Sequence, residues 1–400
     1  MKENILEIRE THIKRIGSKS RLCSDISWGD RNRTLWFEVE SEYEECLCSE
    51  RIDGFLVALL PFAMIRNLNI HSDGYVSERL LYQLTTILLP SLSANINEFH
   101  SIDIDLKRDG KVLESKNGVG TALSCGVDSF FTVLKHLDTD MEGFRLTHLT
   151  YFNIMNSAIW QGREDSSRDF SNARIEYIKP AVEELGLKLV AVDTNFDLFY
   201  RHFGLLATFA FRYLGTVLAL QKLFGKYYWS SSYTVSHFGF SVDNISSFDL
   251  LSVQCVSNEN TTFYSTGSEV TRLEKTAYIS DFAVTYKYLN VCWHYLNNCN
   301  KCEKCVRTML GLYALGKIDR YSEVFDISYF YQNRDEYLGY MLFRLLTKQH
   351  EPSHWAFRNY DEVNKCLRER DIKIPVAAKM HVIKLLLSAI KRRVKELLQA

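Results

Sequence analysis

From residue 118 onward, short apolar runs alternate with longer stretches in which apolar residues recur every three or four positions. The short runs predict strands, and the longer stretches predict helices. The expected strands are residues 119–123, 146–152, 187–192, 227–229, 261–264 and 288–293, and the expected helices are residues 129–137, 166–185 and 205–223. This alternation favours an α/β fold, in which a parallel sheet carries helices on both faces.

The two ends of the chain follow other patterns. In residues 1–115 we expect strands at 33–39 and 102–106, a helix at 78–89, and a strongly apolar stretch at 54–65 that contains Pro61. This mixture predicts an N-terminal mixed α/β extension. Helical patterns predominate from about residue 317, which predicts a C-terminal helical region. The expected segments are therefore 1–115, 116–318 and 319–400.

The last helical segment has a heptad pattern. Seven apolar residues follow alternating spacings of four and three: Val376, Met380, Ile383, Leu387, Ile390, Val394 and Leu397. Residues 375–400 also hold six Lys or Arg and one Glu. The pattern predicts a seam that docks on another helix. Either the body of this protein covers it, with the basic face in solvent, or a partner protein or nucleic acid does.

Charge and hydropathy exclude several classes of protein. The 400 residues include 48 Lys+Arg and 49 Asp+Glu, for a formal net charge of -1, so the chain is no bulk electrostatic binder of nucleic acid. The longest apolar stretch, 205–224, is interrupted by Arg212 and Lys222 and predicts a core helix instead of a membrane span. The first 21 residues lack the apolar core of a signal peptide. We expect a cytoplasmic protein without a membrane partner.

Four of the ten cysteines gather in one 14-residue window: Cys292, Cys299, Cys302 and Cys305. Cysteines in a reducing cytosol are thiols or metal ligands, because disulfides are rare there. Four sulfurs at these spacings suit one tetrahedral Zn²⁺ ion, which would organise a short loop. Redox-active thiols and an iron–sulfur cluster are the alternatives.

A second candidate site joins the first strand of the regular region to the helix after it. Its residues are Ser124, Cys125, Gly126, Val127, Asp128 and Ser129. Small residues let a ligand approach the backbone, and the amides at a helix start attract anions. Asp128 would suit an anion site if Mg²⁺ bridged it to phosphates. A capped turn is the alternative, because Ser and Asp commonly cap helices.

The motif Ser-x-Gly-x-Asp-Ser after a first strand resembles the PP-loop of ATP pyrophosphatases, which usually reads Ser-Gly-Gly-x-Asp-Ser. Cys125 stands where that family has Gly. Two further features are similar to the 7-cyano-7-deazaguanine synthase (QueC) family. One is the spacing C-x6-C-x2-C-x2-C-x-Arg, which ends at Arg307. The other is the segment 266–275, which holds Arg272 and Lys275. This resemblance covers about residues 119–317. Enlarged QueC-like proteins also resemble members of anti-phage defence operons.

The resemblance implies a PP-loop fold and an enzyme that uses ATP, Mg²⁺ and Zn²⁺. A substrate carboxylate of the 7-deazapurine type would attack the α-phosphate, pyrophosphate would leave, and ammonia or an amine would then attack the adenylate. It implies phosphate contacts from residues 124–129, catalytic roles for Asp128 and Ser129, charge stabilisation by Arg272 and Lys275, and adenine near Tyr151 and Asp193. Arg272, Lys275 and Arg307 can also be surface or salt-bridge residues.

Two other functions remain open at the level of sequence. One is a tRNA-modifying PP-loop sulfurtransferase, for which Cys125 is the only thiol in the loop. The other is a QueC-like subunit that binds ligands without catalysis. The amine acceptor could belong to a partner protein, and the chain could also pair with a second copy of itself.

Overall fold

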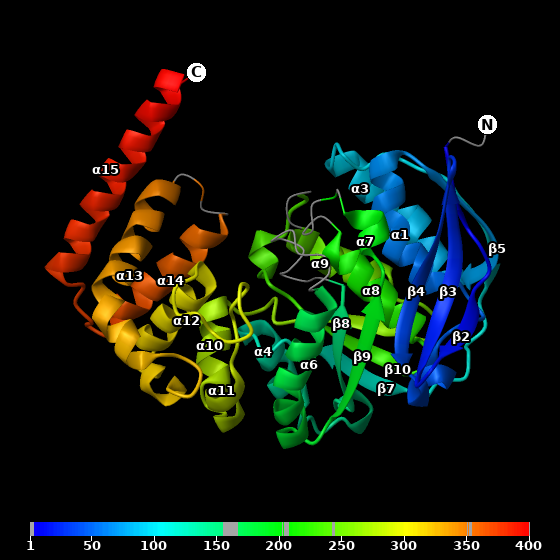
Figure 1. Cartoon of the computed structure of the whole chain (residues 1–400), viewed down its shortest axis with the longest axis horizontal. Helices are drawn as coiled ribbons and strands as arrows, with labels where there is room; N and C mark the ends of the chain where they lie inside the picture. The colour runs from blue at the N-terminus through cyan, green and yellow to red at the C-terminus, as the bar shows by residue number, and fades with distance from the viewer. Residues whose placement is uncertain are drawn as a thin grey trace. The chain divides into compact units, whose positions relative to one another are not determined.

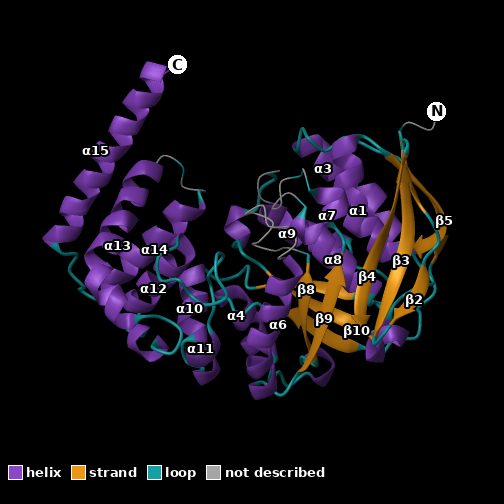
Figure 2. Cartoon of the chain, viewed as in Figure 1, coloured by secondary structure: helices purple, strands orange, loops and turns teal. Residues whose placement is uncertain are grey.

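A computed structural model describes residues 4–154, 167–201, 203, 208–241, 245–349, 351 and 354–399 of the chain (Figures 1 and 2). Two predicted helices begin outside these ranges, at residue 166 and at residues 205–207. The described part of the chain is α/β, with one large sheet and a helical C-terminal region. No helix within the described ranges has the length and hydropathy that a membrane span requires.

The regular region of the sequence forms five parallel strands. They are β7(Gly118–Ala122), β8(His148–Asn153), β9(Lys188–Thr194), β10(Phe224–Ser230) and β11(Thr262–Thr266). Their order across the sheet is β11-β10-β7-β8-β9, so successive strands are added first to one side of β7 and then to the other. The parallel sheet predicted from the sequence is confirmed in this part of the chain.

The N-terminal segment extends the same sheet instead of forming one of its own. Its strands are β1(Ile5–Ile8), β2(His12–Ile16), β3(Lys19–Trp28), β4(Arg31–Glu40), β5(Asn69–Ser77) and β6(Ile104–Asp109). Strand β4 pairs with β9 in antiparallel fashion, with Phe37 opposite Thr194. The complete sheet is therefore mixed, and its antiparallel strands lie in this extension.

One face of the sheet is covered by α1(Asp53–Arg66) and α8(Phe209–Ala219), which pack against each other. A Cβ on Gly54 would lie 2.8 Å from the Gly215 carbonyl oxygen, so only glycine permits this approach of the two helices. Buried Asp53 accepts hydrogen bonds from the Ser77 amide and the Asn258 side chain. The shorter α2(Glu78–Gln83), π-helix η2(Leu84–Leu88) and α3(Leu89–Asn95) realise the predicted helix at 78–89.

The opposite face carries α6(Ser167–Glu184). The side chains of β9 alternate between the two faces: Val190 and Val192 join the large core, whereas Leu189, Ala191 and Asp193 face a groove beside α6. Gly186 ends the helical segment in the left-handed conformation, as the sequence predicts for a helix stop. Helices therefore cover both faces, as predicted.

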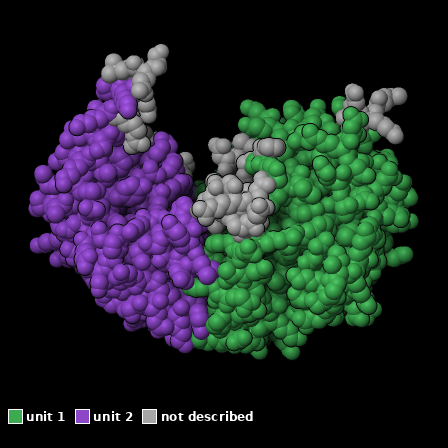
Figure 3. Space-filling model, viewed as in Figure 1, with its two compact units in different colours: residues 1–124, 132–269 green, residues 125–131, 270–400 purple. Residues whose placement is uncertain are grey.

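The chain divides into two compact units (Figure 3). Unit 1 comprises residues 1–124 and 132–269, and unit 2 comprises residues 125–131 and 270–400. Unit 2 holds the start of α4(Val127–His136) and the helices α10(Arg272–Ile279), α11(Ala283–Tyr288), α12(Glu303–Ala314), α13(Ile327–Lys348), α14(Trp355–Glu369) and α15(Val376–Gln399). These units divide the chain differently from the three segments expected from the sequence.

Two predicted elements differ from the structure. The predicted strand at 288–293 is wrong: Tyr288 ends α11, and the following residues form a loop in which Leu289, Val291 and Cys292 are buried. Burial in a loop produced the same apolar pattern as a short strand. The helix predicted at 205–223 ends earlier, at Ala219, because tight turns lead from there into β10.

Candidate anion site and metal centre

The loop before α4 places a cysteine in a conformation that favours glycine. Cys125 has a φ of 58° and is buried. Its carbonyl oxygen accepts a hydrogen bond of 2.8 Å from the Asn290 amide, which ties the loop to the segment that leads into the cysteine cluster. A side chain in the left-handed region costs about 1–2 kcal/mol relative to glycine. The structure thus identifies a positive φ at the position where the PP-loop motif has Gly.

The first turn of α4 is closed by its own hydrogen bonds. The Gly126 carbonyl accepts from the Phe130 amide at 2.9 Å and from the Ser129 hydroxyl at 3.0 Å. Ser129 is buried, and in the described conformation its hydroxyl donates to the carbonyl of Gly126 within this turn. These bonds belong to an ordinary first helical turn, in which Asp128 also lies.

Asp128 meets both basic residues that the sequence singled out. One carboxylate oxygen of Asp128 lies 2.5 Å from Nη1 of Arg272, and the other lies 3.2 Å from Nζ of Lys275. Burial alone would raise the pKa of Asp128, but the charges of Arg272 and Lys275 outweigh it and hold that pKa well below its usual range. Asp128 is therefore ionised at neutral pH.

The start of α10 positions these two cations. Thr271 caps the helix: its hydroxyl accepts from the Glu274 amide, and the Glu274 carboxylate accepts from the Thr271 amide. This capping box fixes Arg272 as the first helical residue and places Lys275 one turn later. The Lys275 side chain is only 2% exposed, and its ammonium group lies 5.8 Å from the ring centre of Phe131.

Two further basic residues come from the first two turns of α12. Burial, followed by the charges of Arg272 and Arg307, lowers the pKa of Lys304 well below its usual value. Burial also lowers the pKa of Arg307 to about 10, and its Nε is buried without a hydrogen-bond partner among the described residues. Aromatic rings support both: Lys304 lies 4.1 Å from the Trp293 ring centre, and Arg307 lies 5.4 Å from that of Trp355.

The cluster therefore carries a surplus of positive charge. Asp128 is one carboxylate beside three cations, Arg272, Lys275 and Arg307, which act on it electrostatically. The Lys304 amine lies beside them, and burial and their charges lower its pKa. Glu303 also acts on Arg307, but its own carboxylate lies 3.6 Å from Nε of Arg344. Buried like charges are costly unless an anion compensates them. Chemically, the arrangement suits a ligand with several negative charges.

The four clustered cysteines form a candidate metal centre within unit 2. Their sulfur atoms all lie within 4.8 Å of one another, with 3.5 Å between Cys302 and Cys305 and 3.9 Å between Cys299 and Cys305. Four sulfurs around a tetrahedral Zn²⁺ at about 2.3 Å would be about 3.8 Å apart. The Cys302 amide donates to the Cys299 sulfur at 3.2 Å, a contact typical of thiolate ligands. The donors thus fit zinc.

The metal centre and the cation cluster share one helix start. Cys302 is the N-cap of α12, Cys305 lies in its first turn, and Lys304 and Arg307 flank Cys305. An ion held by Cys302 and Cys305 would fix the direction in which α12 begins and, with it, the positions of both basic residues. The sequence reasoning found Arg307 but missed Lys304, whose signal is its place between the third and fourth cysteines.

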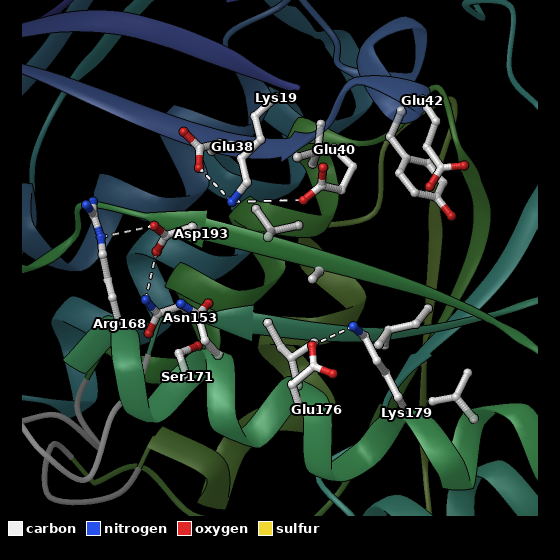
Figure 4. Close-up of a pocket in the computed structure, with 18 of the residues that line it drawn as sticks. Lys19, Glu38, Glu40, Glu42, Asn153, Arg168, Ser171, Glu176, Lys179 and Asp193 are labelled. Carbon is white, nitrogen blue, oxygen red and sulfur yellow. Dashed lines mark hydrogen bonds and ion pairs between the residues drawn. The ribbon is translucent and has the colours of Figure 1, made fainter. Parts of the chain in front are cut away.

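Unit 1 contains a separate groove of about 670 Å³ between α6, β9 and β4 (Figure 4). Asp193 lies in it, accepts from the Asn153 amide group at 2.7 Å and pairs with Arg168 at 3.2 Å. Lys19 faces Glu38 and Glu40 on the other side. Carboxylates outnumber cations along its lining, so the groove suits a neutral group better than a phosphate. Tyr151, expected beside Asp193, is not among the lining residues.

No protein-family model, no curated protein and no solved structure matches the chain.

Proposed function

We propose that this protein is an ATP-dependent, AMP-forming enzyme that activates a carboxylate, as its resemblance to the PP-loop and QueC families implies. The observation that supports the proposal most is the pairing of Asp128 with Arg272 and Lys275 at the start of α4. Residues of a suspected phosphate loop and of a suspected charge-stabilising segment, 144 positions apart, meet within one unit.

In the proposed reaction, a substrate carboxylate oxygen attacks the α-phosphate of ATP, and the bond from that phosphorus to the bridging oxygen of pyrophosphate breaks. Negative charge then grows on the leaving pyrophosphate. Cations that are already oriented stabilise such charge without reorganising. Arg272, Lys275 and Arg307 are our candidates for this role, and the amides at Gly126 and Val127 are candidates for phosphate contacts.

The described loop fits a polyanion better than a divalent cation. Both carboxylate oxygens of Asp128 already face cations, and Asp128 is the only carboxylate in residues 124–129. We therefore assign the neutralisation of phosphate charge to Arg272, Lys275 and Arg307. The four-cysteine centre, which fits zinc, has a structural role in the proposal.

The resemblance suggests the reactants. The carboxylate would be of the 7-deazapurine type, and the group that attacks the acyl-adenylate would be ammonia or an amine, either free or on a partner protein. An amide, AMP and pyrophosphate would be the products. With ammonia, activation of the amide oxygen by a second ATP and loss of that oxygen would give a nitrile. A cytoplasmic location, as expected from the sequence, would give the enzyme access to ATP.

A second candidate is a subunit that binds ligands without catalysis. Cys125 in the left-handed region favours it, because a Cβ there is unfavourable where a PP-loop has glycine. A sulfurtransferase is less well supported. Cys125 is buried, and the four clustered sulfurs contact one another instead of standing apart as nucleophiles.

Release of pyrophosphate from ATP, measured with a panel of purine and deazapurine carboxylic acids, tests the proposal. We expect Arg272→Gln and Lys275→Met each to reduce the rate by about 100-fold or more, because each removes an oriented cation. Lys365→Met is the matched control, since Lys365 is exposed and pairs with Asp361 on α14. ATP binding by calorimetry without pyrophosphate release with any acid would favour the binding subunit instead.

A further inference from the structure

The C-terminal helix α15 presents two different apolar faces. Ala378 and Val382 are buried, and α15 packs on α13 within unit 2 (Figure 1). The contact is close: a Cβ on Gly339 of α13 would lie 2.7 Å from the Ala378 carbonyl oxygen and 2.8 Å from Cβ of His381. This face uses small residues and holds the helix in place.

The heptad seam lies on nearly the opposite side of α15, because a helix has 3.6 residues per turn. Six of its residues are between 49% and 74% exposed: Val376, Met380, Ile383, Leu387, Ile390 and Val394. Leu397, the seventh, has a side chain outside the described set. Docking on α13 therefore does not cover the seam, which runs for about 27 Å at 1.5 Å per residue. An exposed apolar stripe of this size marks an interaction surface.

The charges beside the seam select its partner. In a heptad with Met380 and Leu387 at position a and Ile383 and Ile390 at position d, Lys384 and Lys391 occupy position e, and Lys379 occupies position g. All three lysines are exposed. Two copies of α15 would set lysine against lysine in either orientation, parallel or antiparallel. Self-pairing is therefore disfavoured, and a partner with acidic flanking positions is favoured.

The shape of the apolar surface also distinguishes a helix from a membrane. Helices that lie in a membrane interface usually have a broad apolar sector with Trp or Phe. The large apolar side chains described as exposed on α15 lie at a and d positions, and the half-buried Leu386 lies at g. The helix contains no Phe, Trp or Tyr. Its opposite side is occupied by α13. These features match one strand of a coiled coil.

We propose that the seam of α15 is a docking site for an acidic amphipathic helix of a partner protein, which would pair its own a and d residues with the seam and its carboxylates with Lys379, Lys384 and Lys391. This inference rests on the geometry of α15 alone. It does not depend on the function proposed for the loop and the cysteine centre.

Binding of designed peptides to the full chain tests the inference. The probe is a peptide of about four heptads with Leu and Ile at a and d and Glu at every e and g position, and the control peptide has Lys at e and g. We expect the acidic peptide to bind one per chain and at least about tenfold more tightly than the basic one. Its affinity should fall as salt rises, because exposed charges are screened.

Two substitutions at exposed positions separate docking from folding. Ile383→Glu places a negative charge in the seam and should lower the affinity for the acidic peptide at least about tenfold. Ser388→Glu, a matched charge at an exposed position outside the seam, should reduce binding by about threefold or less. The double change Lys384→Glu and Lys391→Glu should reverse the preference between the two peptides. Each variant should keep the melting temperature of the wild type.

Four outcomes would overturn the inference. The first is no binding of the acidic peptide at low salt, and the second is equal binding of both peptides. The third is a wild-type dimer that Ile383→Glu dissociates, which would identify a second copy as the occupant. The fourth is binding to phosphatidylserine vesicles, lost in Ile383→Glu, in place of binding to the acidic peptide.

Discussion

Cys125 holds a backbone conformation in which a side chain is costly. Its φ is 58°, and its side chain is buried. Cys125→Gly should remove the strain but lose a small apolar side chain, whereas Cys125→Ala should lose the sulfur and keep the strain. We expect Gly to be more stable than Ala here by about 1 kcal/mol, measured by urea unfolding. An alanine variant as stable as the glycine variant would show that the position is unstrained.

His136 in unit 1 should make stability depend on pH. Its ring stacks on Tyr228 with centres 3.7 Å apart, and its Nε2 lies 2.8 Å from the Thr266 hydroxyl. Burial, followed by the charge of Lys135, lowers the pKa of His136 to about 4, against about 6.5 in an unfolded chain. The neutral ring therefore stabilises the fold fully above pH 6.5, and this contribution declines as pH falls towards 4.

The matched variant for this prediction is His136→Gln, which cannot gain a proton. The difference in unfolding free energy between wild type and variant should shrink by about 1–2 kcal/mol from pH 7 to pH 4, allowing for solvent screening at a half-buried ring. Urea unfolding across this range measures it. A difference that stays constant over the range would contradict the prediction.

At the scale of elements, the cysteine loop depends on an ion for its order. The loop from Cys292 to Cys302 contains no helix or strand, and α12 begins directly after it. Cys302→Ala should remove zinc from the purified protein and lower its melting temperature, because three thiolates hold the ion poorly. Elemental analysis should give one zinc per wild-type chain.

Cys366→Ala is the control for the metal centre. The Cys366 thiol lies outside the cluster and contacts the Ala314 carbonyl at 3.5 Å, so this variant should keep its zinc. Iron with visible absorbance, or zinc content unchanged in Cys302→Ala, would refute the zinc assignment.

Two helical glycines of unit 2 should respond in opposite ways to alanine. At Gly339 a Cβ would meet backbone and side chain of α15 below 3.0 Å, so Gly339→Ala should destabilise the protein by about 1–3 kcal/mol. At Gly311 the nearest atom to a Cβ is Leu273 Cδ1 at 3.5 Å, an ordinary contact. Gly311→Ala should therefore stabilise α12 by about 0.5–1 kcal/mol. Thermal unfolding of both variants measures the contrast, and equal shifts would argue against close packing of α13 and α15.

Local patterns predicted most elements, because the spacing of apolar residues in a strand or helix can be recognised from residues that are close in sequence. The strands β7, β8 and β9 and the helix α6 were found in this way. The same reasoning failed for residues 288–293, where a buried loop imitates a strand. It also missed Lys304, because the position of Lys304 beside Arg272 and Arg307 arises only when the chain folds.

In the molecule as a whole, the pairing of β4 with β9 joins residues about 155 positions apart. No local pattern in the sequence predicts this pairing. The sequence predicted an N-terminal mixed α/β extension at 1–115, because the regular alternation of strands and helices begins only near residue 118. In the structure this segment supplies six strands of the sheet and α1, which is buried against α8.

This continuity leads to a prediction about dividing the chain. A fragment of residues 116–400 would expose the edge of β9 and the face of α8 around Gly215, both of which are covered by residues 1–115. Unpaired strand edges and large apolar faces promote aggregation. We expect this fragment alone to be insoluble or to unfold without cooperativity, and co-expression with a separate fragment 1–115 to restore a soluble complex. Solubility, co-purification and cooperative thermal unfolding are the measurements. If residues 116–400 folded alone with a sharp transition, the N-terminal segment would be an independent extension after all, and the shared sheet would contribute little to stability.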